Sequence, residues 1–327
     1  MHSDAEPRQF DGVPLFDPRT GSTVIEPPGS GAGWWAGAPS ACYDEQRRRY
    51  LLYYRLRKPR ALGRGGECRI AASEDGLRFE TIWSARREEF GSQSIERSCL
   101  VQSPEGRWRL FIAYVDPADE RWRIDLLEAD RPEEFRPAER QKVLTAADIG
   151  GEGVKDPVVY RQEGGWLMVV SYAPAKPDAP AAEREQMHAT ADVYNTGIVK
   201  SHTGLALSED GRSFTWAGDI LSPPDTGWDS YCTRVSALLP TPHGWVALYD
   251  GSASVAENYE ERAGVATGPD LRHLQRQTVD GPALTSPHAS GSVRYVEALR
   301  RPGEIHYYYE YARPDGSHEL RVSRVAA

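Results

Sequence analysis

The chain has 327 residues, 39% hydrophobic and 27% charged, a composition typical of a globular rather than a disordered protein. Its formal net charge of −9 argues against nucleic acid as a partner, because phosphate binding requires a surplus of lysine and arginine. No stretch has the roughly 18 to 20 apolar residues that cross a bilayer, and residues 1–30 are polar and proline-rich without an apolar signal core. We therefore expect a cytoplasmic protein with neither nucleic-acid nor membrane partners.

A pattern with a period of about 55 residues recurs five times along the chain. Each copy has a short apolar run, then an aromatic-rich apolar segment, then a further apolar segment. The aromatic-rich segments are 48–57, 106–117, 164–174, 243–252 and 303–312. Glycine-containing turns such as Pro-Glu-Gly and Pro-His-Gly separate the first two strands, which is typical of hairpins.

Aromatic-rich units of this length, with three clear strands and room for a fourth, are typical of a β-propeller. The predicted fold is all-β: a five-bladed β-propeller with four-stranded antiparallel blades, since two β-sandwiches would not explain a five-fold recurrence. We expect residues 1–327 to form this single domain, with the N-terminal segment 1–30 closing the ring.

The repeat contains one insertion and one four-residue motif that occurs twice. Residues 176–201 form an extra polar insertion in the third blade, and loops of this length are usually either functional lids or disordered excursions. Both interpretations stay open. The sequence Ser-Glu-Asp-Gly occurs at 73–76 and at 208–211, in the same place of two copies, and we interpret it as a structural turn.

The four cysteines are far apart, lie in apolar stretches and show no CxxC spacing; they are Cys42, Cys68, Cys99 and Cys232. We expect them to be small core residues rather than a redox or metal site. No cofactor is expected. A structural metal near the axis, within reach of His288 or His306, is left as an alternative.

In a propeller, the starts of the first strands and the ends of the second strands converge on one rim of the central axis. The first strands begin with Ala38, Glu96, Arg97, Lys155, Asp156, Thr233, Arg234, Ser292 and Arg294. The second strands end with Arg55, Asp116, Tyr172, Asp250 and Glu310. Charged residues beside apolar strands are rarely buried unless they are paired or functional. The pattern therefore predicts a charged central pocket, in which Trp34, Trp35 and Trp228 could provide flat surfaces for sugar rings.

Three segments resemble motifs of five-bladed glycoside hydrolases and phosphorylases: SIERSCL (94–100), GVKDPVVYRQEGGWLMVVSY (153–172) and TRVSALLPTPHGWVALYDGS (233–252). They are similar to the second-, third- and fourth-blade motifs of the β-mannoside phosphorylases and, less closely, of the arabinanase and β-xylosidase family. The resemblance spans most of the chain from about Trp34. It implies a carbohydrate-active enzyme on a five-bladed propeller.

The catalytic positions of these families are altered here. The resemblance places Arg97 where the phosphorylases have their catalytic Asp, and Ala38 where the arabinanase-type enzymes have their general base. Thr233 and Arg234 stand in place of the general acid. Asp156 is retained, at a position that orients the acid in the arabinanase-type enzymes, and Lys155 matches a phosphate-binding lysine of the phosphorylases.

Glycoside cleavage usually needs two carboxylates on either side of the bond. We assign Glu96 and Asp156 as the catalytic carboxylates. Substrate binding is assigned to Trp34, Trp35, Arg97, Lys155, Arg234, Asp250 and Arg294. The cations suit an anionic glycoside, or they pair with the two carboxylates. The expected function is that of a glycoside hydrolase or phosphorylase acting on a sugar. The alternatives are a non-hydrolytic sugar- or metabolite-binding propeller and an enzyme repurposed for other chemistry such as elimination.

Overall fold

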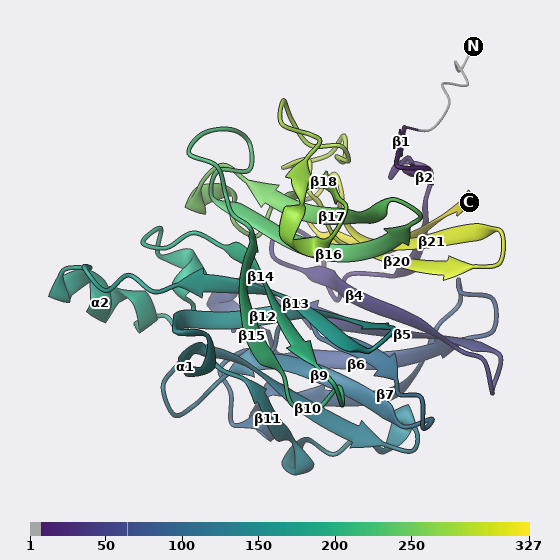
Figure 1. Ribbon diagram of the computed structural model, residues 1–327, viewed down its shortest axis with the longest axis horizontal. Coiled ribbons are helices and arrows are strands. Elements are labelled where there is room, and N and C mark those ends of the chain that lie inside the picture. Colours follow the sequence, from purple (N-terminus) through teal and green to yellow (C-terminus); the bar gives the residue numbers. More distant parts are fainter. Residues whose placement is uncertain (1–7, 64) are drawn as a thin grey trace.

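The computed structural model describes residues 8–63 and 65–327, and strands make up most of its regular structure (Figure 1). Of the predicted N-terminal segment 1–30, residues 1–7 lie outside the described part. Within the described part, no helix is long and apolar enough to cross a membrane.

Most strands follow one another in antiparallel meanders, in which each strand pairs with the next. The first meander contains β4 (Trp35–Asp44), β5 (Arg49–Arg57), β6 (Glu67–Ser73) and β7 (Glu80–Arg86). The second contains β8 (Cys99–Gln102), β9 (Trp108–Val115), β10 (Trp122–Ala129) and β11 (Gln141–Leu144). The third contains β12 (Gly151–Gln162), β13 (Gly165–Pro174), β14 (His202–Ser208) and β15 (Thr215–Leu221).

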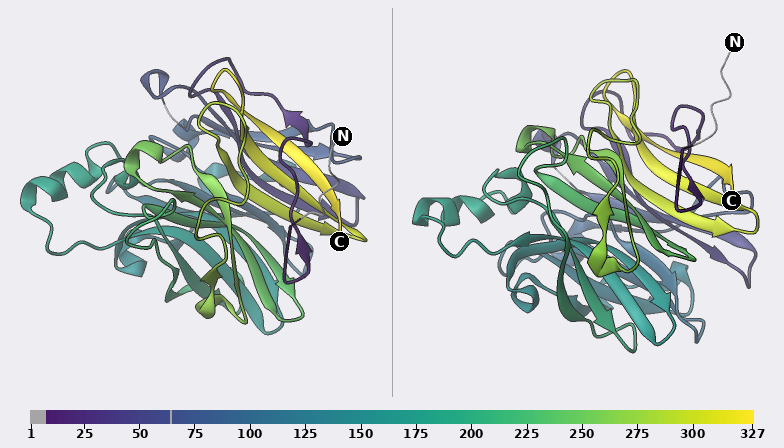
Figure 2. Two further views of the ribbon diagram at one scale, coloured as in Figure 1. Left: turned by 90° about the horizontal axis from the view of Figure 1, so that it is seen from above. Right: turned by 45° about the horizontal axis from the view of Figure 1, so that its top comes forward.

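The last two meanders have short or borrowed outer strands. The fourth contains β16 (Cys232–Thr241), β17 (Gly244–Ser252), β18 (Arg262–Gly268) and β19 (Gln275–Arg276). The fifth contains β20 (Val293–Arg301), β21 (Glu304–Ala312), β22 (His318–Ala326) and, from the N-terminal part, β3 (Ser22–Ile25). A small hairpin of β1 (Gln9–Phe10) and β2 (Val13–Pro14) precedes β3 and lies near the C-terminal strands in Figures 1 and 2.

Helices are few and short. The α-helices are α1 (Ala146–Ile149) and α2 (Ala181–His188). The 3-10 helices are η1 (Arg60–Leu62), η2 (Arg87–Phe90), η3 (Pro132–Glu134), η4 (Pro137–Glu139), η5 (Val193–Asn195), η6 (Val255–Glu257) and η7 (Leu271–His273). Helix α2 belongs to the insertion between β13 and β14, and it projects from the side of the sheets in Figures 1 and 2.

The core lies between the meanders, as a series of apolar layers that each join two of them. Separate buried clusters join the first meander to the second, the second to the third, the third to the fourth, and the fourth to the fifth. A further cluster, which includes Leu52 and Tyr54 of the first meander and Tyr308 and Leu320 of the fifth, joins the two ends of the series. Burying two apolar faces per meander is the main favourable contribution to such a fold.

Bulges at the starts of the first strands aim side chains away from the sheet. The pairing register shifts after Gly37 in β4, after Lys155 in β12, after Val235 in β16 and after Arg294 in β20. The next residue in three of these strands has a left-handed backbone: φ is 54° at Ala38, 55° at Asp156 and 49° at Tyr295. Residues other than glycine rarely adopt this conformation, and bulges with it commonly redirect side chains at functional sites.

Candidate active site

The charged residues at the starts and ends of the strands meet in one buried ion-pair network. Its members are Arg55, Glu96, Lys155, Asp156, Arg234, Asp250, Glu261, Arg294 and Glu310. Each is at most 3% exposed. Because an unpaired buried charge is very costly, the fold must balance these groups against one another. Four cations face five carboxylates.

Glu96, the first predicted catalytic residue, is surrounded by donors. It pairs with Arg55, and its Oε2 lies 3.5 Å from Lys155 Nζ. Its Oε1 accepts a hydrogen bond of 3.4 Å from the Tyr295 hydroxyl. The cations and the hydroxyl all favour the ionised carboxylate, which suits a base or an electrostatic role.

Lys155 connects the two predicted catalytic carboxylates. Its Nζ lies 3.6 Å from Asp156 Oδ2 as well as 3.5 Å from Glu96 Oε2. The ammonium also faces the rings of Trp122, at 5.1 Å, and Tyr194, at 4.7 Å, in cation–π contacts. Burial lowers the pKa of Lys155, and the negative charge of Asp156 opposes that shift.

Arg234 and Arg294 link the rest of the network. The Arg234 guanidinium lies 2.9 Å from Asp250, 3.2 Å from Glu261 and 3.5 Å from Asp156. The Arg294 guanidinium lies 2.8 Å from Glu261 and 2.6 Å from Glu310. Burial raises the pKa of Asp250 to about 6, although the positive charge of Arg234 opposes this rise.

Asp156 is the least satisfied member of the network. It is fully buried, yet neither of its carboxylate oxygens accepts a hydrogen bond from any residue that the structure describes. Its nearest cations, Lys155 and Arg234, stay at 3.6 and 3.5 Å. A buried carboxylate normally accepts hydrogen bonds, so its oxygens are suited to a hydroxyl group or a water molecule.

The remaining predicted binding residues divide into two groups. Trp35 lies beside the network, with its ring stacked on His318 at 4.7 Å and facing the guanidiniums of Arg57 and Arg294. The contacts of the other two are with residues outside the network. Trp34 is half-buried and packs over Gly29, where an added Cβ would collide with its ring. Arg97 donates to the carbonyl oxygen of Pro39.

Arg97, which precedes β8 of the second meander, has its partners in the first and fifth meanders. Its Nη2 lies 2.5 Å from the carboxylate of Glu297 in the fifth meander, and burial raises the pKa of Glu297 to about 7 while Arg97 opposes the rise. The sequence offered Glu96 as a partner of Arg97, whereas the two side chains have different partners: Glu96 pairs with Arg55 and Lys155, and Arg97 pairs with Glu297.

Several residues of this region were not identified from the sequence. Glu261 directly precedes β18 and His318 begins β22, while Tyr194 lies in η5 of the insertion and Tyr259 in the connection between β17 and β18. Tyr295 offered a signal, because Arg294-Tyr295 occupies the place of Lys155-Asp156 in another copy of the repeat. Loop residues offered none, since their positions depend on tertiary packing.

Residues that the sequence suggested for other roles lie elsewhere. His306 stacks on Tyr50 and contacts Glu304, and His288 packs against Tyr311. Among the described residues, no group of three or more histidine, cysteine, aspartate or glutamate side chains is arranged to hold a metal ion. Trp228 stacks on Tyr249.

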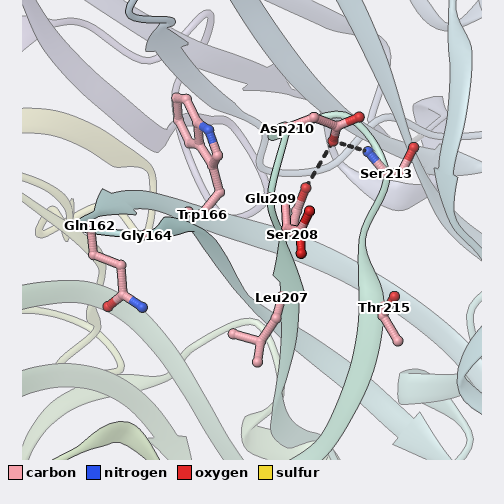
Figure 3. A pocket seen from close by; sticks show the side chains of 10 residues that line it. Gln162, Gly164, Trp166, Leu207, Ser208, Glu209, Asp210, Ser213 and Thr215 are labelled. Atoms are coloured by element: carbon pink, nitrogen blue, oxygen red, sulfur yellow. Dashed lines mark hydrogen bonds between the residues drawn. The ribbon is translucent and has the colours of Figure 1, made fainter.

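A surface pocket of about 550 Å³ surrounds the second Ser-Glu-Asp-Gly turn, next to Trp166 and Thr215 (Figure 3). Asp210 closes the turn by accepting hydrogen bonds from the Ser208 hydroxyl and the backbone N–H of Ser213. Asp75 makes the same contacts in the first meander. These hydrogen bonds explain the repeated motif as a turn-forming device.

Comparison with known proteins defines the class of fold. No family model and no curated protein matches the chain. Solved structures of propeller-type glycoside hydrolases and phosphorylases do match it over almost its whole length, which confirms the resemblance seen in the sequence.

A glycosyl hydrolase from Bacteroides ovatus has a TM-score of 0.65 at 15% identity and covers 98% of both chains. The β-1,2-mannobiose phosphorylase from Listeria innocua has a TM-score of 0.64 at 16% identity, covering 93% of this chain and 94% of its own. A thermostable family-43 glycoside hydrolase has a TM-score of 0.64 at 14% identity, covering 93% and 92%. At these identities the comparisons define the fold.

Proposed function

We propose that this protein is a carbohydrate-active enzyme, a glycoside hydrolase or phosphorylase that acts on a small glycoside at the buried ion-pair network. The observation that carries the proposal is Asp156, a fully buried carboxylate whose oxygens accept no hydrogen bond from the described residues. Glu96, joined to it through Lys155, supplies the second carboxylate. Sugar hydroxyls are donors of the kind that Asp156 lacks.

The proposal includes the arrangement of the chain as one five-bladed propeller with the meanders as its blades. It is supported by the apolar clusters that join each meander to the next and the fifth to the first. The pairing of β3 with β22 supports the expectation that the segment 1–30 closes the ring. The single domain 1–327, with 176–201 as an insertion in the third blade, belongs to this proposal, as does a cytoplasmic location.

The pairing of charges within the network affects whether an anionic or a neutral substrate can bind. Arg234 and Arg294 are each paired with two or more carboxylates, and Lys155 is shared by Glu96 and Asp156. An anionic ligand would have to displace one of these pairs, whereas a neutral sugar would not. Turnover of a glucuronide compared with the matching glucoside tests whether the substrate is anionic.

A second candidate function is sugar or metabolite binding without turnover. It is favoured by Ala38 and Arg234, which stand where related enzymes have their base and acid, and by the close mutual pairing of the charges. Release of the aglycone from any aryl glycoside would exclude it.

The experiment is a screen of 4-nitrophenyl and 2,4-dinitrophenyl glycosides, mannosides included, with and without inorganic phosphate. Asp156→Asn should lower kcat/KM by at least about 100-fold while the circular dichroism spectrum and Tm stay close to those of the wild type. Asp229→Asn is the matched control, because Asp229 is equally buried but pairs with Arg276 and Tyr249 outside the network. Undiminished turnover by Asp156→Asn would refute the assignment.

A further inference from the structure

Arg57 is a buried arginine without an anionic partner. Six arginine side chains in the described part of the chain are at most 4% exposed. Five of them form ion pairs or hydrogen bonds; these are Arg55, Arg97, Arg109, Arg234 and Arg294. Arg57 forms neither with any residue that the structure describes, and its buried Nη1 has no acceptor. Because an unpaired buried charge is costly, its retention indicates a partner from outside the chain.

Two aromatic rings enclose the Arg57 guanidinium. Its Cζ lies 4.8 Å from the centre of the Trp35 ring and 4.4 Å from the centre of the Tyr259 ring. Contacts of this kind attract the charge, but they provide no oxygen acceptor for the N–H groups in the plane of the guanidinium. Burial, assisted by the charge of Arg55, lowers the pKa of Arg57 to about 10, so the side chain is still positively charged at neutral pH. The rings therefore hold a cation whose hydrogen-bond donors are unused.

Arg57 lies beside the ion-pair network. It is the last residue of β5 and follows Arg55 by two positions, so both side chains leave the same face of the strand. The Trp35 ring that Arg57 faces also faces the Arg294 guanidinium, at 4.7 Å, and stacks on His318. A ligand held by Arg57 is therefore next to the proposed active site without displacing any of its ion pairs.

Tyr259 covers the position at which such a ligand would bind. It is partly exposed, whereas Arg57 and Trp35 are buried, and Arg57 is only 4% exposed, so a ligand reaches it only if the Tyr259 ring moves. Tyr259 lies between β17 and β18 with φ 83°, a strained backbone for a residue with a bulky side chain. Strain of this kind is common at ligand clamps and switch regions. An aromatic ring and a pyranose ring are similar in size, so displacement of the Tyr259 ring makes room for one sugar over Trp35 and Arg57.

We propose that Arg57 binds the carboxylate of an acidic sugar and that the Tyr259 ring moves aside to admit it. The inference rests on the proposed function, whose substrate it identifies as a glycoside of a uronic acid. The planar guanidinium presents paired N–H groups that match the two oxygens of a carboxylate. A single unpaired cation balances the single charge of that group. Trp35 supplies the flat apolar surface against which the sugar ring packs.

The test measures binding to the full-length protein by isothermal titration calorimetry. The probes are the methyl glycosides of glucuronic, galacturonic and mannuronic acid, each compared with its neutral parent glycoside and with inorganic phosphate. The wild type should bind at least one of the acids, and Arg57→Met should weaken that binding by about 10- to 100-fold. The Tm of Arg57→Met should equal or exceed that of the wild type, since the change removes an unpaired buried charge. Tyr259→Ala should bind the acid at least as tightly as the wild type, because no ring has to be displaced.

Arg109→Met is the matched control. Arg109 is also buried and also faces a tryptophan, Trp166, but it donates to the backbone carbonyl oxygens of Asp210 and Gly211. This variant should keep the affinity for the acid and lower the Tm, the opposite of the result expected for Arg57→Met.

Four results would overturn the inference: unchanged affinity of Arg57→Met, a Tm of that variant below the wild-type value, loss of affinity in Tyr259→Ala, or binding of phosphate or neutral sugars but of none of the acids. Turnover of a neutral aryl glycoside would leave the proposed function intact in each case. Failure of the wild type to turn over any aryl glycoside would refute the proposed function, and the binding data distinguish the two failures.

Discussion

Glu310 is a buried carboxylate of the network whose ionisation depends on its neighbours. Its Oε1 lies 2.6 Å from Arg294 Nη2 and 2.7 Å from His318 Nδ1. Burial opposes the ionisation of Glu310, but the charges of Arg294, His318 and Arg55 outweigh burial and hold its pKa at about 2. The group is therefore ionised in the folded protein at every pH above that value.

This pKa makes the stability of the protein depend on pH. The folded pKa of Glu310 is depressed from 4.5 to about 2, so its contribution is present above pH 4.5 and is lost as pH falls toward 2. We expect Glu310→Gln to lower the free energy of unfolding by about 3 kcal/mol at pH 7, and by progressively less below pH 4.5. Urea unfolding of both proteins at pH 7, 4 and 3 measures this. A difference that does not shrink on acidification would contradict it.

The sequence revealed individual residues to different degrees. The pairing of Lys155 with Asp156 was predictable, because adjacent opposite charges before an apolar strand are rare unless they are paired or functional. The partners of Arg97 were not predictable, since Glu297 is two hundred residues away in the chain and meets Arg97 only when the second and fifth meanders face each other. Contacts between distant strands depend on how the meanders pack together and cannot be predicted from local patterns.

At the scale of elements, the insertion 176–201 is folded onto the side of the ion-pair network. Val193, Tyr194 and Met187 pack with Trp122 in one buried cluster. The carbonyl oxygen of Tyr194 accepts hydrogen bonds from Asn258 and from the Tyr231 hydroxyl, so the insertion is fixed to the fourth meander. The sequence indicated an unusual loop, but its composition could not show which side chains it would bury.

The Tyr259 hydroxyl holds this insertion in place, and we predict that Tyr259→Phe lowers the protection of its amides against hydrogen exchange. The hydroxyl of Tyr259 donates to Asp192, and its ring lies 4.4 Å from the Arg57 guanidinium. Loss of one hydrogen bond to a carboxylate, about 1.5 kcal/mol, corresponds to roughly tenfold faster amide hydrogen exchange across 190–200. The strands of the other meanders should be unaffected.

The matched control for this prediction is Tyr249→Phe. Tyr249 also donates its hydroxyl to a buried aspartate, Asp229, but it lies in β17, away from the insertion. Equal exchange across 190–200 in both variants would show that the Tyr259 hydroxyl does not hold the insertion.

For the whole molecule, the successive antiparallel hairpins follow the order of the aromatic and turn signals in the sequence, because each copy of the repeat carries its own. Contacts between opposite ends of the chain were harder to predict. Leu52 and Tyr54 pack with Tyr308 and Leu320, and β3 pairs with β22. The Ser-Glu-Asp-Gly turns, by contrast, are local and were correctly interpreted as structural.

These long-range contacts predict that the chain unfolds as one unit. Phe16 is 5% exposed, and its ring packs 4.7 Å from that of Tyr307 and 4.6 Å from that of Tyr309. Phe16→Ala should lower the free energy of unfolding by about 3 to 5 kcal/mol, because it removes a buried aromatic ring and leaves a cavity. If the meanders form one cooperative domain, the most protected amides of β9 and β13, far along the chain, should lose the same amount of protection.

Val279→Ala is the control: Val279 is 52% exposed, so this change should alter protection very little. Native-state hydrogen exchange measured by mass spectrometry on all three proteins decides the matter: loss of protection confined to β20, β21 and β22 would show that the fifth meander unfolds independently and that the chain is not a single domain.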